Sequence, residues 1–317
     1  MFDSVIENAS HTEFILNGFH SFGEWKSLLF IPFSLIFLLS FFANSLVIHI
    51  IISRRSLHSP MCILIGLLAV HDLFVPIVFV PRMLLSFLFD WNVISLQECL
   101  TQMFFVHFFG TFHSTILLWM ALDRYYAICT PLHYNEHMAY PNILKFVLVP
   151  TVRNSVLILV MVTLASSLSF CHNNVMDHCF CEHMALVQLA CGDISINNLF
   201  GLMAVLLIPT ADFVFTTASY IVIFATVFKY GQNHLKAINT CITHIIVITC
   251  SLMFFLIASL SYRIKNNFTP SSRVFFSAMY LLIPSCFNPI IYAVRTKEIR
   301  QQLVQFLTLV KIKPLRY

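Results

Sequence analysis

Charged residues are scarce in this chain: only 10% of its 317 residues are Asp, Glu, Lys or Arg, whereas 59% are apolar and 33 are Phe. A soluble domain of this length could not bury so much apolar surface, so the composition excludes that class of protein. The chain also lacks the alternation of polar and apolar residues that marks the strands of a membrane barrel. In a bilayer each backbone amide must be bonded within the protein, so the apolar stretches are predicted to be helices.

Seven apolar stretches account for most of the chain. They cover residues 27–52, 60–88, 98–122, 143–168, 197–228, 238–261 and 274–294. Each is close to the length of about 20 residues that a helix needs to cross a bilayer core. The sequence thus predicts an all-α membrane protein with an N-terminal segment over 1–26, a seven-helix domain over 27–294, and a short amphipathic helix and tail over 295–317.

The positive charges predict how the chain sits in the membrane. With seven spans the termini lie on opposite sides, and most cations fall on the side of the C-terminus: Arg54, Arg55, Arg124, Lys145, Lys229, Lys236, Arg295, Lys297, Arg300, Lys311, Lys313 and Arg316. Because cytoplasmic loops carry an excess of Lys and Arg, we expect a cytoplasmic C-terminus and an extracellular N-terminus. The formal net charge of +4 therefore reflects topology and does not indicate nucleic-acid binding.

The N-terminal segment contains one of two sequence motifs for glycosylation. Its 26 residues lack the basic start and apolar centre of a cleaved signal peptide, so the first helix is expected to act as the insertion signal. Asn8-Ala-Ser is expected to be glycosylated on the outer side. Asn267-Phe-Thr also fits the motif, but it lies in a short loop close to the membrane and is expected to stay unmodified.

The most informative segment joins the third apolar stretch to a charged boundary. Residues 120–134 read Met-Ala-Leu-Asp-Arg-Tyr-Tyr-Ala-Ile-Cys-Thr-Pro-Leu-His-Tyr, and they match every fixed position of the signature Met-Ala-x-Asp-Arg-Tyr-x-Ala-Ile-Cys-x-Pro-Leu-x-Tyr of odorant receptors. Pro-Ser-Cys-Phe-Asn-Pro-Ile-Ile-Tyr at 284–292 and Lys-Ala-Ile-Asn-Thr-Cys-Ile-Thr-His at 236–244 are similar to further motifs of that family. The resemblance extends from about residue 25 to about residue 310.

The resemblance implies a function and a set of partners. Odorant receptors belong to the rhodopsin-like seven-helix receptors of the plasma membrane, so we expect a small volatile or water-soluble odorant as ligand and no enzymatic activity or cofactor. The expected protein partners are a stimulatory, olfactory-type G protein that raises cyclic AMP, and trafficking chaperones. The basic amphipathic stretch that begins at Arg295 is suited to lie on membrane lipid.

Signalling residues are inferred from the same motifs. Arg124 is costly in a bilayer unless it is paired, and the adjacent Asp123 offers a partner. By resemblance, Arg124 is released on activation and packs against the G protein; the alternative is a simple cationic anchor at the cytoplasmic boundary. The full set of switch residues that the resemblance implies is Asp123, Arg124, Tyr125, Tyr220, Asn288, Pro289 and Tyr292.

Three polar residues are predicted within the membrane. Asn44 and Asp72 match polar positions of the first and second helices of the family, and an intramembrane carboxylate is a functional candidate by default. His113 departs from the family, which commonly has Glu at this position of the third helix. A titratable imidazole there could make activity depend on pH. The alternative is a neutral histidine that is hydrogen-bonded to a neighbouring helix.

Five of the ten cysteines are predicted to face outside, where disulfides are permitted. Sequence alone does not choose among the possible pairings. The resemblance implies that Cys99 pairs with Cys181 and Cys171 with Cys191, which leaves Cys179 over. Cys179 stands among His172, His178, Glu182 and His183, residue types that can bind a metal ion. A loop does not guarantee the geometry, so no metal is expected.

The ligand is expected in the outer half of the bundle, where a concave site can form between helices. Arg263, in Ser-Leu-Ser-Tyr-Arg, resembles a segment of the class I, fish-like odorant receptors, which often favour carboxylic acids. An arginine can hold a carboxylate with paired hydrogen bonds, and His107 has the depth to orient it. The apolar wall is assigned to Phe104, Phe108, Met203 and Leu256. The alternatives are a solvated loop arginine and an interior histidine with its hydrogen bonds satisfied.

Other functions fit the sequence less well. A transporter or channel should show inverted repeats or a row of intramembrane charges, and neither is found. An intramembrane enzyme should show the motif His-Glu-x-x-His or a nucleophile beside a base. The sequence lacks the motif, and no nucleophile and base share one predicted helix face. A peptide or amine receptor of the same fold lacks an acid near Val106 or His107 to hold an amine.

Overall fold

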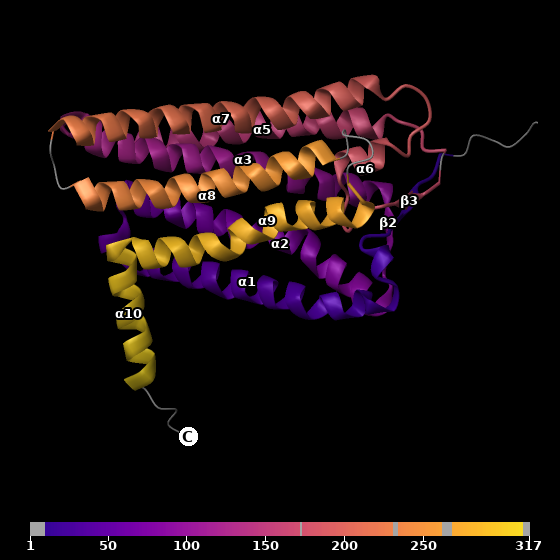
Figure 1. Ribbon diagram of the computed structural model, residues 1–317, viewed down its shortest axis with the longest axis horizontal. Coiled ribbons are helices and arrows are strands. Elements are labelled where there is room, and N and C mark those ends of the chain that lie inside the picture. Colours follow the sequence, from indigo (N-terminus) through magenta and orange to yellow (C-terminus); the bar gives the residue numbers. More distant parts are fainter. Residues whose placement is uncertain (1–9, 172, 231–233, 262–267, 313–317) are drawn as a thin grey trace, which may run out of the picture.

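The computed structural model describes residues 10–171, 173–230, 234–261 and 268–312. Within these residues seven long helices run alongside one another (Figure 1): α1 (Phe30–Ser53), α2 (Pro60–Phe89), α3 (Leu96–Cys129), α5 (Tyr140–Ser166), α7 (Ser195–Tyr230), α8 (His234–Ser261) and α9 (Pro270–Arg295). Six are long and apolar enough to cross a membrane, and α8 contributes a shorter apolar stretch over Ile245–Ser261. The predicted seven-helix bundle is confirmed.

Several helices begin where the sequence supplies a capping residue. Ser95 and Glu98 form a reciprocal capping box at the start of α3, with Ser95 N donating to Glu98 Oε2 over 3.0 Å and Glu98 N donating to Ser95 Oγ over 3.3 Å. Thr269 accepts a hydrogen bond from Ser272 N at the start of α9. Such side chains satisfy amides that would otherwise have no partner in the first turn. They fix the helix starts more exactly than hydropathy does.

Shorter helices connect or extend the bundle. They are the 3-10 helices η1 (His20–Leu29), η2 (Arg55–Leu57) and η3 (Pro131–His133), and the α-helices α4 (Tyr134–His137), α6 (His183–Val187) and α10 (Lys297–Ile312). Figure 1 shows α10 leaving the bundle sideways at one end, which we call the α10 end. Its position fits the amphipathic helix that the sequence predicts after the last span.

A small sheet lies at the opposite end of the bundle, which we call the sheet end (Figure 1). β1 (Glu13–Leu16) pairs antiparallel with β2 (Val93–Ser95), with Glu13 opposite Ser95, and parallel with β3 (Val175–Met176). The sequence analysis predicted helices alone and missed this sheet. Its strands are too short to give a periodic signal, and they form only because three distant segments meet there.

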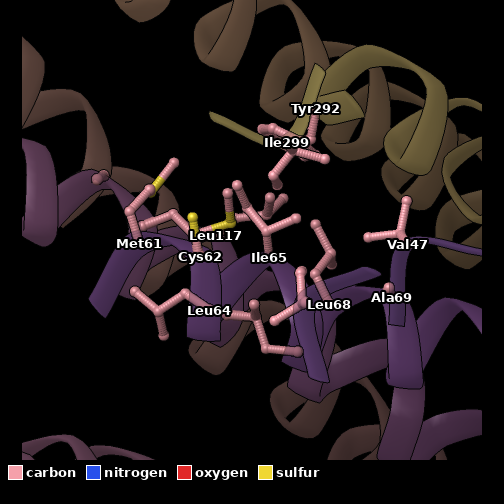
Figure 2. Packing of buried hydrophobic residues seen from close by; sticks show 14 of the residues in the cluster. Val47, Met61, Cys62, Leu64, Ile65, Leu68, Ala69, Leu117, Tyr292 and Ile299 are labelled. Carbon is pink, nitrogen blue, oxygen red and sulfur yellow. The ribbon is translucent and has the colours of Figure 1, made fainter. Parts of the chain in front are cut away.

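The α10 end contains a large buried cluster that links the helices. It includes residues of α1, α2, α3, α7, α8, α9 and α10. Figure 2 shows Tyr292 of α9 and Ile299 of α10 lying over Ile65 of α2. Ile65, Tyr292 and Ile299 are exposed by no more than 2%. Separate clusters fill the sheet end, so the bundle is packed at both ends.

Candidate functional site

The helices enclose a cavity at the sheet end, which we call the main cavity. The space between its lining residues, including the part that opens to solvent, is about 690 Å³. Its walls come from α3, α5, α7, α8 and α9, and residues 180–184 form a roof between α5 and α7. Most of the lining is apolar. The polar residues that line it are His107, Thr111, Glu182, His183, Ser259, Ser277 and Tyr280.

Two histidines bring polar groups together in the main cavity. His107 projects from α3, and its ring centroid lies 6.3 Å from that of His183 in the roof, with the two planes at 88°. Glu182 caps α6, because its Oε2 accepts a hydrogen bond of 2.8 Å from Ala185 N. A small ligand would thus meet hydrogen-bonding side chains at the roof and a mostly apolar lining elsewhere.

Covalent and hydrogen bonds hold the roof in place. Disulfides join Cys99 to Cys181 and Cys171 to Cys191, which are the two pairs that the resemblance implies. Cys181 N also donates a hydrogen bond of 2.8 Å to Gln102 Oε1 of α3. The segment above the main cavity is therefore attached to α3 through both backbone and side chain.

Unlike His107, the other predicted ligand residues are not found in the described lining of the main cavity. Arg263 lies outside the described residues. Phe104 and Phe108 of α3 stack on each other with centroids 6.0 Å apart, and Met203 is 44% exposed. Neither these three residues nor Leu256 belong to the described lining of the main cavity.

The lining includes residues that the sequence analysis did not assign to ligand binding. Glu182 and His183 were considered only for a metal, and Tyr280 and Ser259 were not considered. No sequence signal marks Tyr280 or Ser259, because the helix face that meets a cavity depends on how the helices are rotated against one another.

The loop residues considered for metal binding are mostly buried. Within the described part of the chain, no group of three or more His, Cys, Asp or Glu is arranged to hold a metal ion, and His172 lies outside it. Burial lowers the pKa of His178 to about 3, and burial raises the pKa of the Cys179 thiol. Both residues therefore stay neutral at physiological pH and pack under the roof.

A polar cluster lies in the middle of the bundle. Asn288 Nδ2 of α9 donates to Asp72 Oδ2 of α2 over 2.9 Å and lies 3.3 Å from His113 Nε2 of α3. Asn44 of α1 joins α9 by donating to the Ser285 carbonyl over 2.8 Å. His113 thus has the contact with a neighbouring helix that the second of the two alternatives describes.

His71 is a member of this cluster that the sequence analysis did not single out. Its Nδ1 lies 3.0 Å from Asp72 Oδ1, and its Nε2 lies 2.8 Å from the carbonyl oxygen of Phe109. A signal was present, because a histidine directly precedes the one acid of the second apolar stretch. The cluster therefore joins α2, α3 and α9 through hydrogen bonds that involve His71, Asp72 and Asn288.

The predicted switch residues lie toward the α10 end. Arg124 donates to Asp123 Oδ2 from Nε over 2.9 Å and from Nη2 over 2.5 Å. Tyr134 Oη donates to Asp123 Oδ1 over 2.8 Å, and burial together with the neighbouring Asp123 raises the pKa of Tyr134. Asp123 is fully buried, so its two partners neutralise and satisfy a carboxylate that would otherwise be costly.

The remaining predicted switch residues surround this ion pair. Tyr220 of α7 and Tyr292 of α9 are each 2% exposed and belong to the buried cluster of the α10 end, against which the half-buried Tyr125 packs. Pro289 lies inside α9, directly after Asn288. A proline removes one backbone hydrogen bond and permits a local bend. α9 therefore links the polar cluster to the α10 end.

A third buried carboxylate, that of Asp212, takes part in a network that connects α3, α5 and α7. Asp212 Oδ2 accepts hydrogen bonds from Ser114 Oγ over 2.7 Å and from Thr115 Oγ1 over 2.9 Å. Arg153 of α5 donates to Thr115 Oγ1 over 3.3 Å. Intramembrane charges need such partners. This network holds α7 against α3 beside the main cavity.

Seven apolar helices lie alongside one another in the described residues. They carry the main cavity at the sheet end and the ion pair of Arg124 with Asp123 toward the α10 end. This arrangement defines a seven-helix membrane receptor. Comparison with known protein families is specific: a family model described as "Olfactory receptor" matches residues 33–310. This chain belongs to the olfactory receptor family.

Individual relatives match along almost the whole chain. Olfactory receptor 51G1 of Homo sapiens is 34% identical over 97% of this chain and 97% of its own length. Olfactory receptor 52A5 of Homo sapiens is 39% identical over 92% of this chain and 93% of its own length. Olfactory receptor 51E2 of Mus musculus is 35% identical over 94% of this chain and 93% of its own length. These relatives fit the class I subfamily, and the protein is a multi-pass plasma-membrane receptor and not an enzyme.

Proposed function

We propose that this receptor binds a small carboxylic acid odorant in the main cavity and activates a stimulatory, olfactory-type G protein, which raises cyclic AMP. The observation that carries the proposal is the main cavity itself, where His107, Glu182 and His183 lie at or near the roof and most of the remaining lining is apolar. A short aliphatic acid has the same division into a polar head and an apolar tail.

His107 is proposed to orient the acid head and Arg263 to anchor it. His107 supports this role because it lines the main cavity opposite His183. An arginine forms paired, charge-assisted hydrogen bonds with a carboxylate, which an uncharged side chain cannot replace. Apolar neighbours such as Val106 and Ala204 would then contact the aliphatic tail.

An alcohol odorant is a second candidate, favoured by one observation. Glu182 lines the main cavity, and a carboxylate there repels an acid of the same charge but accepts a hydrogen bond from a hydroxyl group. The two candidates differ in their need for Arg263, because only the acid requires a positive partner. A single odorant screen with the Arg263→Ala variant therefore distinguishes the acid from the alcohol.

The α10 end is proposed to face the cytoplasm and to carry the signal. The excess of Lys and Arg on that side of the sequence supports this orientation. In the proposed mechanism, odorant binding shifts the helices so that Arg124 leaves Asp123 and becomes available to the G protein. The hydrogen bonds of Asp123 with Arg124 and Tyr134 support a resting state in which the arginine is held back.

The test is a cyclic-AMP assay in cells that express the full chain with an olfactory G protein. The compounds are carboxylic acids, alcohols and aldehydes of increasing chain length. Arg263→Ala is the test variant, and Lys265→Ala is the matched control, because it removes the same charge two residues away in the same segment. Surface expression is measured for every variant.

The outcomes separate the parts of the proposal. We expect a response to acids that Arg263→Ala abolishes and Lys265→Ala keeps. A response to alcohols that survives Arg263→Ala would replace the acid by the second candidate. Responses to acids that are equal in both variants would contradict the arginine anchor.

A further inference from the structure

The hydrogen bonds of His71 determine where one of its protons lies. Its Nε2 is 2.8 Å from the backbone carbonyl oxygen of Phe109. A carbonyl oxygen can only accept a hydrogen bond. Nε2 must therefore carry a hydrogen and donate it to α3.

The second ring nitrogen of His71 then faces another acceptor. Nδ1 lies 3.0 Å from Asp72 Oδ1. A hydrogen bond at this distance needs a proton between the two atoms. Either Nδ1 carries it, which gives an imidazolium beside a carboxylate, or Oδ1 carries it, which gives a neutral imidazole beside a carboxylic acid. Both arrangements contain one proton more than a neutral imidazole and a bare carboxylate.

The groups that face this pair supply no other proton. From α9, Asn288 Nδ2 donates to Asp72 Oδ2 over 2.9 Å and lies 3.3 Å from His113 Nε2, which therefore accepts. From α3, the His113 ring is 5.3 Å from the His71 ring, where a second positive charge would be repelled. From α1 the facing group is the hydroxyl of Ser40, bonded to the Asp72 carbonyl, and from α9 the titratable neighbours are the phenols of Tyr280 and Tyr292.

Burial makes the shared proton necessary. Asp72 is 0% exposed and His71 is 6% exposed, deep in the membrane bundle. A bare carboxylate in such a place is very costly, whereas one that shares a proton with an adjacent imidazole is electrically neutral as a pair. The proton belongs to the pair and not to either residue.

We propose that His71 and Asp72 form an internal proton-binding site that holds one shared proton at the junction of α2, α3 and α9. The bonds that define the site come from Phe109 of α3 and Asn288 of α9. Helix movements that break those bonds therefore change the affinity of the pair for its proton. The adjoining cavity of about 220 Å³ is lined by His71, Asp72 and His113, and its neighbours Gly110 and Tyr280 also line the main cavity. The site does not depend on which odorant is bound.

The test is the pH dependence of stability of the purified full chain in detergent. Stability falls with rising pH where the folded protein binds more protons than the unfolded chain, and it rises with pH where the folded protein binds fewer. For one proton, the unfolding equilibrium constant changes by up to about tenfold per pH unit. An unfolded histidine loses its proton near about pH 6.5 and an unfolded aspartate near about pH 4. The pair should therefore contribute no slope between about pH 5 and 6.5, and stability should fall above about pH 6.5.

Asp72→Asn is the first test variant. Its amide cannot share the proton, so folded His71 stays neutral while the unfolded chain still takes up a proton below about pH 6.5. Relative to the unaltered receptor, this variant should lose stability steadily as the pH falls from about 8 to about 5, by up to about tenfold per unit. If the unaltered pair held no shared proton, the two curves would be parallel, and that result would overturn the proposal.

The double variant His71→Gln with Asp72→Asn keeps a decision possible if the single variant fails to fold. It binds no proton at this site in either state, so its curve should parallel that of the unaltered receptor below about pH 6.5 and rise above it at higher pH. The reverse, divergence only below about pH 6.5, would contradict the shared proton. Asp193→Asn is the control: Asp193 is exposed, and hydrogen bonds from Ser195 lower its pKa, so its curve should be parallel throughout.

Discussion

In the proposed mechanism, the Asp123 carboxylate holds the receptor in its resting state. It is fully buried and accepts hydrogen bonds from both Arg124 and Tyr134. Because the proposed resting state contains both hydrogen bonds, loss of the bond from Tyr134 would destabilise that state relative to one in which Arg124 is released. Tyr134 and Arg124 are thus linked through a carboxylate that both of them contact.

Tyr134→Phe should raise basal cyclic-AMP output. The change removes the hydrogen bond of 2.8 Å to Asp123 while keeping the ring. A hydrogen bond to a charged group contributes about 1.5 to 3 kcal/mol, which corresponds to a shift of at least about tenfold toward states with Arg124 released. The control is Tyr140→Phe, since Tyr140 is 74% exposed. Equal basal output in the two variants would contradict the role of Tyr134.

His178 should make the sheet end sensitive to acid. Its folded pKa of about 3 lies below the ordinary value of 6.5 because of burial. A depressed folded pKa means that stability is fully present above the unfolded pKa and is lost as the pH falls from about 6.5 toward about 3. His178→Gln should therefore gain stability relative to the unaltered receptor in unfolding measurements below about pH 6.5.

The control for this prediction is His133→Gln, which removes a histidine whose side chain is 66% exposed. The acid sensitivity should depend on burial and not on the number of histidines. If His178→Gln and His133→Gln show the same pH profile, burial of His178 does not cause the acid sensitivity.

Among the helices and loops, the segment before α1 packs closely against Cys179, the residue that precedes the roof. A Cβ atom added at Gly18 would lie 2.7 Å from the backbone N and Cα atoms of Cys179. Real Cβ atoms do not approach backbone so closely, so glycine is required at this contact. The segment before α1 and the segment around Cys179 therefore pack closely together at the sheet end.

Gly18→Ala should lower the free energy of unfolding by about 1 to 3 kcal/mol, the usual cost of overpacking. Gly66→Ala in α2 is the matched control, because the nearest side-chain atoms lie 3.6 Å from the added Cβ atom. That control should be neutral or stabilising by up to about 1 kcal/mol, since alanine favours a helix. The measurement is the unfolding midpoint of each variant, and equal midpoints would contradict the close contact.

The helices were predictable from sequence, whereas their contacts were not. The seven predicted stretches each overlap one long helix, because apolar length alone determines a membrane span. Hydropathy does not record rotation about the helix axis, which explains why Phe104 and Phe108 were assigned to the ligand wall while Tyr280 was overlooked. The sheet was missed because strands as short as Val175–Met176 have no recognisable period.

The pairing of Arg124 with Asp123 was predictable for a different reason, because the two residues are adjacent in the chain. The bond from Tyr134 to Asp123 was not predicted, although Tyr134 lies in the same fifteen-residue segment. The polar cluster required the fold, because Asp72 and Asn288 are separated by 216 positions. His71 was overlooked although it adjoins Asp72, since its meaning depends on the carbonyl of Phe109 across the helix interface.

The receptor as a whole should have its N-terminus outside the cell. Asn8 belongs to a glycosylation motif in the segment that precedes α1, and it lies outside the described residues. Treatment of the expressed receptor with a glycosidase should increase its electrophoretic mobility, and Asn8→Gln should abolish that change. An unchanged mobility of the unaltered receptor, or a change that persists in Asn8→Gln, would contradict this assignment.

We propose that an odorant acts from within the main cavity, so a side chain that fills this cavity should prevent the response. Ala204 of α7 lines the cavity and is 2% exposed, whereas Leu207 of the same helix is 57% exposed. Odorant-evoked cyclic AMP should be measured for Ala204→Trp and Leu207→Trp at matched surface expression, with the compound that activates the unaltered receptor. We expect Ala204→Trp to abolish the response and Leu207→Trp to preserve it. An undiminished response in Ala204→Trp would contradict the proposal.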